Sequence, residues 1–209
     1  MRHLPPSRIC RLGTLFPAML LACVFSACKG LDYVSTRPLD DTGFSYSAVQ
    51  QLVALDVDKT EVPELVKAKN GDVSEQACIE LVRAARSRKQ RFASGAAVAG
   101  LHAAGVGDSA IVELAKLDLI GSWTGEAQAI RLIGISDRTL LAVAHRHAEN
   151  KPTFSGNSLG RLKNAGIGEA TIYELAVRGI SDADVDTIIT GRHKRGVTDA
   201  DILRAYPPQ

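Results

Sequence analysis

Histidine and glutamate are the side chains of this sequence that could do acid–base or metal chemistry, and their spacing favours neither. His145 and His147 are two residues apart, which on a helix places them about 200° apart around the axis. They therefore cannot share one metal ion as an i, i+4 pair can. Glu113 and Glu174 stand at equivalent places of two sequence repeats. Such recurrence favours helix pairing or solvation, because a catalytic pair would be expected only once.

The remaining residues give no catalytic arrangement either. No Ser–His–acid order, Cys–His pair or phosphate-binding loop follows from the spacing. We therefore expect no catalytic residue, no metal site and no cofactor, and a protein that is not an enzyme. An enzyme with an unrecognised active site is kept as an alternative.

Six short motifs recur along the chain and indicate where one helix ends and the next begins. Each consists of a hydrophobic residue, a small or hydroxyl residue and an acid, and a glycine precedes the last five. The motifs are Val73-Ser74-Glu75, Val106-Gly107-Asp108, Ile135-Ser136-Asp137, Ile167-Gly168-Glu169, Ile180-Ser181-Asp182 and Val197-Thr198-Asp199. Glycine ends one helix because it adopts positive φ at low cost, and the cap and the acid favour the start of the next. The motifs therefore predict tight corners between short helices.

A longer repeat encloses these corners. Phe92, Trp123 and Phe154 are spaced 31 residues apart, and each is followed by a hydroxyl residue and a glycine. Each unit reads as an aromatic residue, a cap, a short helix, a corner and a second helix. An earlier, degenerate unit begins at Phe44, with Asp56 in place of the corner glycine.

These repeats predict an all-α fold. Single extra helices are expected to interrupt the array near Ser74, Ser181 and Thr198. No stretch alternates with period two for long enough to form a strand. We expect about eleven short helices. They should form tandem helix–corner–helix repeats of about 31 residues, stacked into one compact right-handed domain.

The first 27 residues have the composition of a signal peptide. A basic start reaches Arg11, and residues 14–27 carry no charge. This stretch is short for a membrane span, which needs about 20 residues, but typical of the apolar part of a signal peptide. It ends in Phe25-Ser26-Ala27-Cys28, which resembles the lipobox of bacterial lipoproteins. The resemblance implies lipidation of Cys28; the alternative is an ordinary cleaved signal peptide and a secreted or periplasmic soluble protein.

The residues after Cys28 indicate the destination and the domain limits. By the same resemblance, Lys29 implies an anchor in the outer membrane, with the protein facing the periplasm. Residues 29–43 have little to bury and are expected to form a flexible tether. The expected organisation is a signal peptide at 1–27, the lipidated cysteine and tether at 28–43, the helical repeat domain at 44–206 and a tail at 207–209.

Cysteine use and charge limit the redox chemistry and the partners. Cys78 is the one cysteine within the repeats, and its inward helical position favours a buried, small apolar role. Residues 1–27 hold three of the 25 basic residues and none of the 23 acids, so 22 basic and 23 acidic residues remain, a net charge of −1. This balance does not favour nucleic acid. Two basic runs, 83–91 and 192–195, fall at expected helix ends, where cations suit the dipole; the alternatives are binding of anionic lipid headgroups or of another envelope polyanion.

One feature keeps nucleic acid as an alternative partner. Gly105-Val106-Gly107 and Gly166-Ile167-Gly168 each join two expected helices, and they resemble the helix-hairpin-helix motif of DNA-binding proteins. The resemblance implies that the amides of Gly107 and Gly168 contact a phosphate. Asp108 and Glu169 follow directly and place negative charge at that position.

Together these features predict a lipid-anchored cell-envelope protein whose helical repeats form a protein- or peptide-binding module. The expected partner, besides the membrane, is another envelope protein or a peptide held in a groove between helix pairs. The sequence names no residue of that groove. DNA binding of the helix-hairpin-helix type is the first alternative, and enzyme activity the second.

Overall fold

The computed structural model describes residue 39 and residues 41–208, and in this part the chain is entirely helical. Eleven α-helices and one short 3-10 helix, η2 (Asp182–Asp184), follow one another with no strand among these residues. The α-helices are α3 (Tyr46–Ala54), α4 (Val62–Asn70), α5 (Glu75–Ser87), α6 (Gly95–Ala103), α7 (Asp108–Lys116), α8 (Thr124–Leu132), α9 (Asp137–Ala148), α10 (Gly156–Asn164), α11 (Glu169–Val177), α12 (Val185–Arg192) and α13 (Asp199–Ala205). The predicted all-α fold is confirmed.

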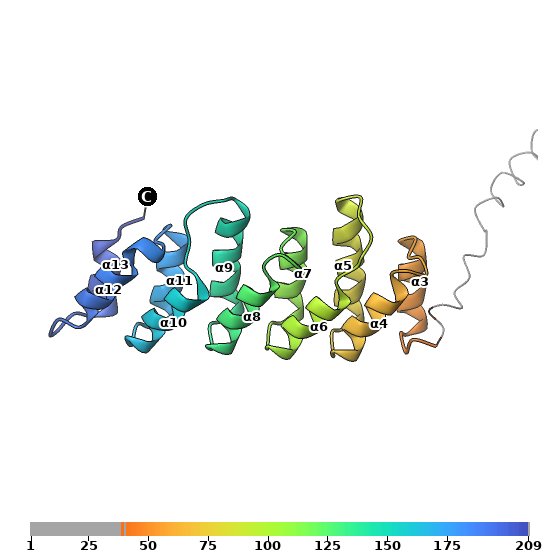
Figure 1. Ribbon diagram of the computed structural model, residues 1–209, viewed down its shortest axis with the longest axis horizontal. Helices are drawn as coiled ribbons and strands as arrows, with labels where there is room; N and C mark the ends of the chain where they lie inside the picture. The colour runs from red at the N-terminus through yellow and green to blue at the C-terminus, as the bar shows by residue number, and fades with distance from the viewer. Residues whose placement is uncertain (1–38, 40, 209) are drawn as a thin grey trace, which may run out of the picture. The chain divides into compact units, whose positions relative to one another are not determined.

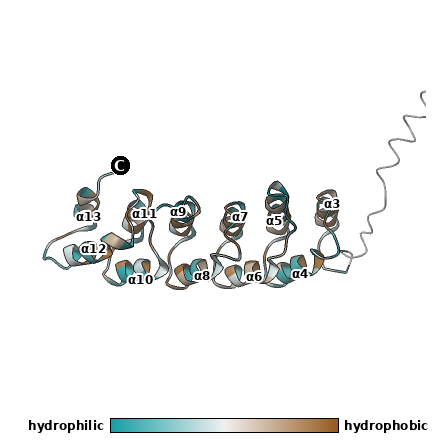
Figure 2. Cartoon of the chain, turned by 45° about the horizontal axis from the view of Figure 1, so that its top comes forward, coloured by the Kyte–Doolittle hydropathy of each residue, from teal (hydrophilic) through white to brown (hydrophobic). Residues whose placement is uncertain are grey.

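The helices form two layers, which appear as an upper and a lower row in Figure 2 and follow one another along the array in Figure 1. The odd layer contains α3, α5, α7, α9, α11 and α13, and the even layer contains α4, α6, α8, α10 and α12. Within each layer, a helix packs on the helix two places away along the chain, as α4 does on α6 and α5 on α7. One apolar core joins the layers. The helix–corner–helix units are therefore stacked as the repeat predicts.

Glycine corners end five of the eleven α-helices. Five such glycines have φ between 76° and 86°: Gly105, Gly134, Gly166, Gly179 and Gly196. After the first of them, the amide of Val106 donates to the carbonyl of Leu101 at 3.0 Å, and the Val106 side chain is buried. This bond and this apolar contact define a Schellman helix end. The corner motifs thus form the structure that their residues predict.

The other helix ends turn on residues that are not glycine. Their φ angles lie between 55° and 63°, at Asp56, Asp72, Lys89, Asp118 and Asn150. Aspartate and asparagine tolerate this region better than most residues. Because Asp72 makes such a corner, the helix capped by Ser74 is α5, a regular member of the odd layer between α3 and α7. The expectation of extra helices interrupting the array is wrong, and α12 and α13 also continue the alternation.

The repeat domain begins earlier than expected. Leu39 is 3% exposed and belongs to the core with Phe44, although the sequence placed it in the tether. All the described residues, 39 and 41–208, belong to one compact unit. The expected signal peptide and Cys28 lie outside the described residues. In the part of the chain that the structure describes, no helix combines the length and the apolar character that crossing a bilayer requires.

Candidate functional site

Five of the six corner-motif acids bind the amide of the preceding cap residue in the odd layer. The amide of Gly107 donates to Oδ2 of Asp137 at 3.0 Å, and the amide of Gly168 donates to Oδ2 of Asp199 at 2.8 Å. These are the two amides that the helix-hairpin-helix resemblance assigns to a phosphate. Each already holds an anionic group of the chain, which a phosphate would have to displace.

The same contact recurs along the odd layer, and we call the series the corner ladder. Its other members join the amide of Ser45 to Glu75, that of Ser74 to Asp108 and that of Ser136 to Glu169, at 2.8–3.1 Å. The sequence indicated only that each acid suits the dipole of its own helix. The structure adds a bond that ties each helix to its neighbour in the layer.

Two ladder carboxylates, Glu75 and Glu169, are held in their ionised form. Hydrogen bonds from Lys69 and Ser45 lower the pKa of Glu75 to about 2. Burial alone would raise the pKa of Glu169, but bonds from Ser136 and Thr139 outweigh burial and lower it. These acids are therefore unsuited to proton donation near neutral pH, and their role is to connect the units.

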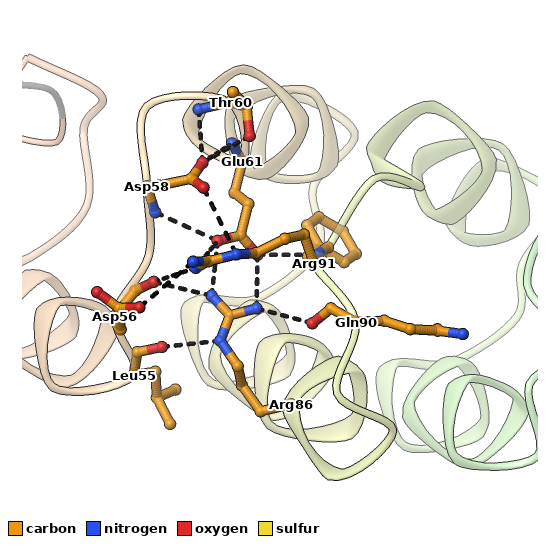
Figure 3. A network of polar contacts seen from close by, with 9 residues as sticks. Leu55, Asp56, Asp58, Thr60, Glu61, Arg86, Gln90 and Arg91 are labelled. Atoms are coloured by element: carbon orange, nitrogen blue, oxygen red, sulfur yellow. Dashed lines mark hydrogen bonds and ion pairs between the residues drawn. The ribbon is translucent and has the colours of Figure 1, made fainter.

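A buried glutamate replaces the aromatic residue at one step of the 31-residue register. Glu61 is fully buried and stands 31 residues before Phe92. Its carboxylate accepts bonds from Arg86 at 2.6 and 2.8 Å and from the Phe92 amide at 2.7 Å (Figure 3). Arg86 also donates to the carbonyls of Leu55 and Asp56. The network therefore joins the ends of α3 and α5 to the start of α4.

The Glu61 network is a structural ion pair. Burial alone would raise the pKa of Glu61, but bonds from Arg86 and from the amides of Phe92 and Asp58 outweigh burial and hold the pKa below its ordinary value. Arg91 approaches the same carboxylate at 3.3 Å. A carboxylate that is fully buried, ionised and paired twice has no free position for a substrate proton. It supports the fold and offers no general acid.

The two histidines of α9, His145 and His147, and Cys78 make contacts within the fold. The ring of His147 stacks on Trp123 with centroids 5.5 Å apart, and Nε2 of His145 lies 3.6 Å from Glu113. No three His, Cys, Asp or Glu side chains form a metal-binding group within the described residues. Cys78 is buried as expected; burial, with a smaller effect from the charge of Asp108, raises the pKa of its thiol to about 12. Such a thiol stays protonated and unreactive.

The two basic runs differ in whether their side chains are paired within the fold. In the first run, carboxylates pair with four arginines: Arg83, Arg86, Arg88 and Arg91. That run therefore belongs to the fold. In the second run, Arg192 pairs with Asp199 and donates to the carbonyl of Val197, whereas residues 193–195 are exposed at the corner between α12 and α13.

The junctions between neighbouring helices of the odd layer differ on their solvent side. Equivalent positions can be compared at each junction by counting from the N-cap residue of each helix. The sixth residue after the N-cap of one helix corresponds to the ninth residue after the N-cap of the next helix in the layer. From α3 to α11 these pairs are Gln51 with Arg83, Glu80 with Lys116, Glu113 with His145, and Ala142 with Val177. Arg83 donates to Gln51 at 3.2 Å across the first junction, and His145 approaches Glu113 across the third. The fourth pair alone is apolar.

This apolar junction opens into a cavity of about 440 Å³, which we call the α9/α11 groove. Its walls are Arg138, Leu141, Ala142, His145, Arg146, Glu149, Tyr173 and Val177. Val177 is 50% exposed, which is unusual for a large apolar side chain of this domain. The guanidinium of Arg138 lies 3.7 Å from the centroid of the Tyr173 ring, a cation–π contact. The groove thus combines apolar surface with a positioned cation, within the size range of ligand sites.

A larger cavity of about 700 Å³ lies between α12 and α13. Its acids are already used: Asp186 pairs with Arg161, and Asp201 pairs with Arg204 and bonds to Thr198. We therefore take the α9/α11 groove as the candidate site.

The groove residues were not singled out from the sequence, although the sequence contains a signal for them. Aligning the odd-layer helices on their caps shows that Ala142 and Val177 break a series of polar pairs. That alignment requires Ser74 and α5 to be regular members of the layer, which the structure establishes. No family model, curated protein or solved structure matches the chain.

Proposed function

We propose that this chain is a lipid-anchored envelope protein whose helical repeat domain binds another protein or a peptide. The observation that carries the binding role is the α9/α11 groove, where the exposed side chain of Val177 and an apolar junction replace the polar pairs of the earlier junctions. Exposed apolar surface next to ordered polar groups is typical of interaction sites. Stacked helical repeats commonly use such surfaces to hold partners.

The anchor is proposed from the resemblance of residues 25–28 to a lipobox. Two or three acyl chains, at about 0.8 kcal/mol per buried CH₂, would make membrane attachment effectively permanent. The test is fractionation of cells that carry the native chain or Cys28→Ala. We expect the native protein in the membrane fraction and the variant outside it. A native protein found free in the periplasm or medium would contradict the anchor.

The binding role is tested by site-specific photocrosslinking in the envelope. A photoreactive residue replaces Val177 in one variant, and in two control variants it replaces Tyr46 on α3 or Asn157 on α10, both exposed. We expect a polypeptide adduct of one mass from position 177 alone. No adduct at any of the three positions would contradict a protein-binding role. An adduct from position 46 or 157 only would support a protein-binding role but contradict its assignment to the α9/α11 groove.

DNA binding is retained as a second candidate because of the two Gly-hydrophobic-Gly corners. Its weakness is that Asp137 and Asp199 occupy the amides of Gly107 and Gly168. We therefore expect that the protein does not bind to immobilised duplex DNA at about 150 mM salt, where even non-specific contacts are typically weak. Tight, salt-dependent binding under those conditions would favour this candidate over the first.

A further inference from the structure

The α9/α11 groove has a charge as well as an apolar floor, and the charge indicates what it binds. Between Arg83 and Arg204, most arginines form an ion pair with a carboxylate. The arginines of this part of the chain that form none are Arg138, Arg146 and Arg195, and the first two line the groove. Its one acid, Glu149, is neutralised by Lys151 at 2.6 Å. The groove therefore presents two cations without a carboxylate partner among the described residues.

The position of Arg138 suits a carboxylate ligand. Its guanidinium lies against the Tyr173 ring, and stacking of this kind leaves the N–H groups at the edge of the plane free to donate. A planar, fixed guanidinium can bind a carboxylate through two parallel bonds. Because the stacking already restricts the side chain, less conformational entropy is lost when the ligand binds.

The spacing of the groove residues along α9 gives the ligand its length. Arg138 and Arg146 are eight residues apart, and Leu141 and Ala142 lie between them on the same helical face. Eight residues correspond to about 12 Å of helix. A partner helix that lies along the groove would meet the two arginines with acids about two turns apart. Apolar residues between those acids would cover Leu141, Ala142 and Val177.

We propose that the α9/α11 groove binds an amphipathic helical segment of a partner protein, with acids at both ends of an apolar patch. This inference rests on the proposed binding role and adds the chemistry of the partner. The binding mode is that of a helix in a groove, in which apolar anchors supply affinity and flanking charges supply orientation.

The test uses the full-length protein in mild detergent and a fluorescent synthetic helix. The helix carries glutamates eight residues apart with leucines between them on one face, and a control helix carries lysines in place of the glutamates. We expect saturable binding of the glutamate helix by fluorescence anisotropy and none of the lysine helix. Arg138→Gln should weaken binding about tenfold, as loss of a charge-assisted bond does. Val177→Asp should weaken it at least as much.

The matched control is Arg161→Gln, which removes an exposed arginine of α10 that pairs with Asp186 outside the groove. It should leave the affinity unchanged, and circular dichroism of all three variants should match the native protein. Equal binding of both helices, no binding of the glutamate helix, or an affinity that is unaffected by Arg138→Gln and Val177→Asp would overturn the proposal. If position 177 still crosslinks a partner in the envelope after such a result, the binding role stands and only the assigned chemistry fails.

Discussion

The corner ladder and the α9/α11 groove show two different uses of one repeat. In the ladder, a carboxylate of each corner binds an amide of the preceding corner, at every junction of the odd layer from α3 to α13. At the groove, a pair of positions that is polar in three earlier junctions becomes Ala142 and Val177. Contacts that recur hold the units together. Replacing a polar pair by exposed apolar side chains does not stabilise the fold. We therefore propose that the function resides at this junction.

The Glu61 network is also a departure from the repeat, and the contrast with the groove is informative. Glu61 stands where later units have an aromatic residue, yet it is fully buried and its carboxylate is bonded to Arg86 and to the Phe92 amide. The Glu61 side chain is not exposed to solvent. A departure inside the core should therefore change stability, whereas a departure at the surface should change binding.

Acid should cause the largest loss of stability, because it acts on many repeated contacts at once. The pKa of Glu75 is lowered from 4.5 to about 2, and the pKa values of Glu61 and Glu169 are also lowered. A group with a lowered folded-state pKa stabilises the fold above its unfolded pKa and loses this effect as the pH falls towards the folded value. Urea midpoints should therefore be level from about pH 8 to 5 and fall below about pH 4.5. A fall that begins above pH 6 would contradict an origin in these carboxylates.

Removing the buried carboxylate should have the largest effect of any single substitution. Glu61→Ala leaves Arg86 and the Phe92 amide without their partner and should cost about 3–5 kcal/mol of unfolding free energy. The measurement is urea denaturation, with Glu149→Ala as the control, because that exposed acid should contribute about 0–1 kcal/mol. If the two variants lost equal stability, the network would not be the structural joint that its geometry indicates.

Substituting a corner glycine should cost less unfolding free energy than substituting Glu61, but more than substituting a glycine inside a helix. Gly166 has a φ of 76°, so Gly166→Val places a β-branched residue in the left-handed region and should cost at least about 1–2 kcal/mol. Gly160 lies inside α10, where an added Cβ would meet Ile133 at an ordinary 3.6 Å. Gly160→Ala should therefore stabilise by up to about 1 kcal/mol. Melting temperatures that fall equally for both variants would contradict the corner geometry.

A single step of the ladder should contribute a smaller amount. Asp137→Ala leaves the amide of Gly107 without its anionic acceptor and should cost about 1 kcal/mol, since the bond is only partly buried. Asp186→Ala removes an exposed acid outside the ladder and should cost less than about 0.5 kcal/mol. The two urea midpoints, measured at neutral pH, separate a ladder contact from a surface ion pair. The ladder would lose its assigned role if both variants matched the native protein.

The sequence predicted the fold further than it predicted the site, for reasons visible in particular residues. Glycine corners, caps and inward apolar positions are local signals, and they identified the helices and most of their ends. The corner at Lys89 was missed because lysine gives no residue-type signal for the left-handed region. The groove was missed because Leu141 and Val177 meet only when α9 and α11 are placed side by side.

The most direct test of the central claim is to restore the recurring polar pair at the fourth junction. The double variant Ala142→Glu, Val177→His recreates there the pair that Glu113 and His145 form at the third junction. We predict that the unfolding free energy from urea denaturation will stay within about 0.5 kcal/mol of the native value, as for most surface substitutions. Binding of the glutamate helix should be lost, because the apolar floor disappears and an acid faces the ligand. Unchanged binding, or a stability loss of several kcal/mol, would contradict the claim that this departure from the repeat serves function rather than fold.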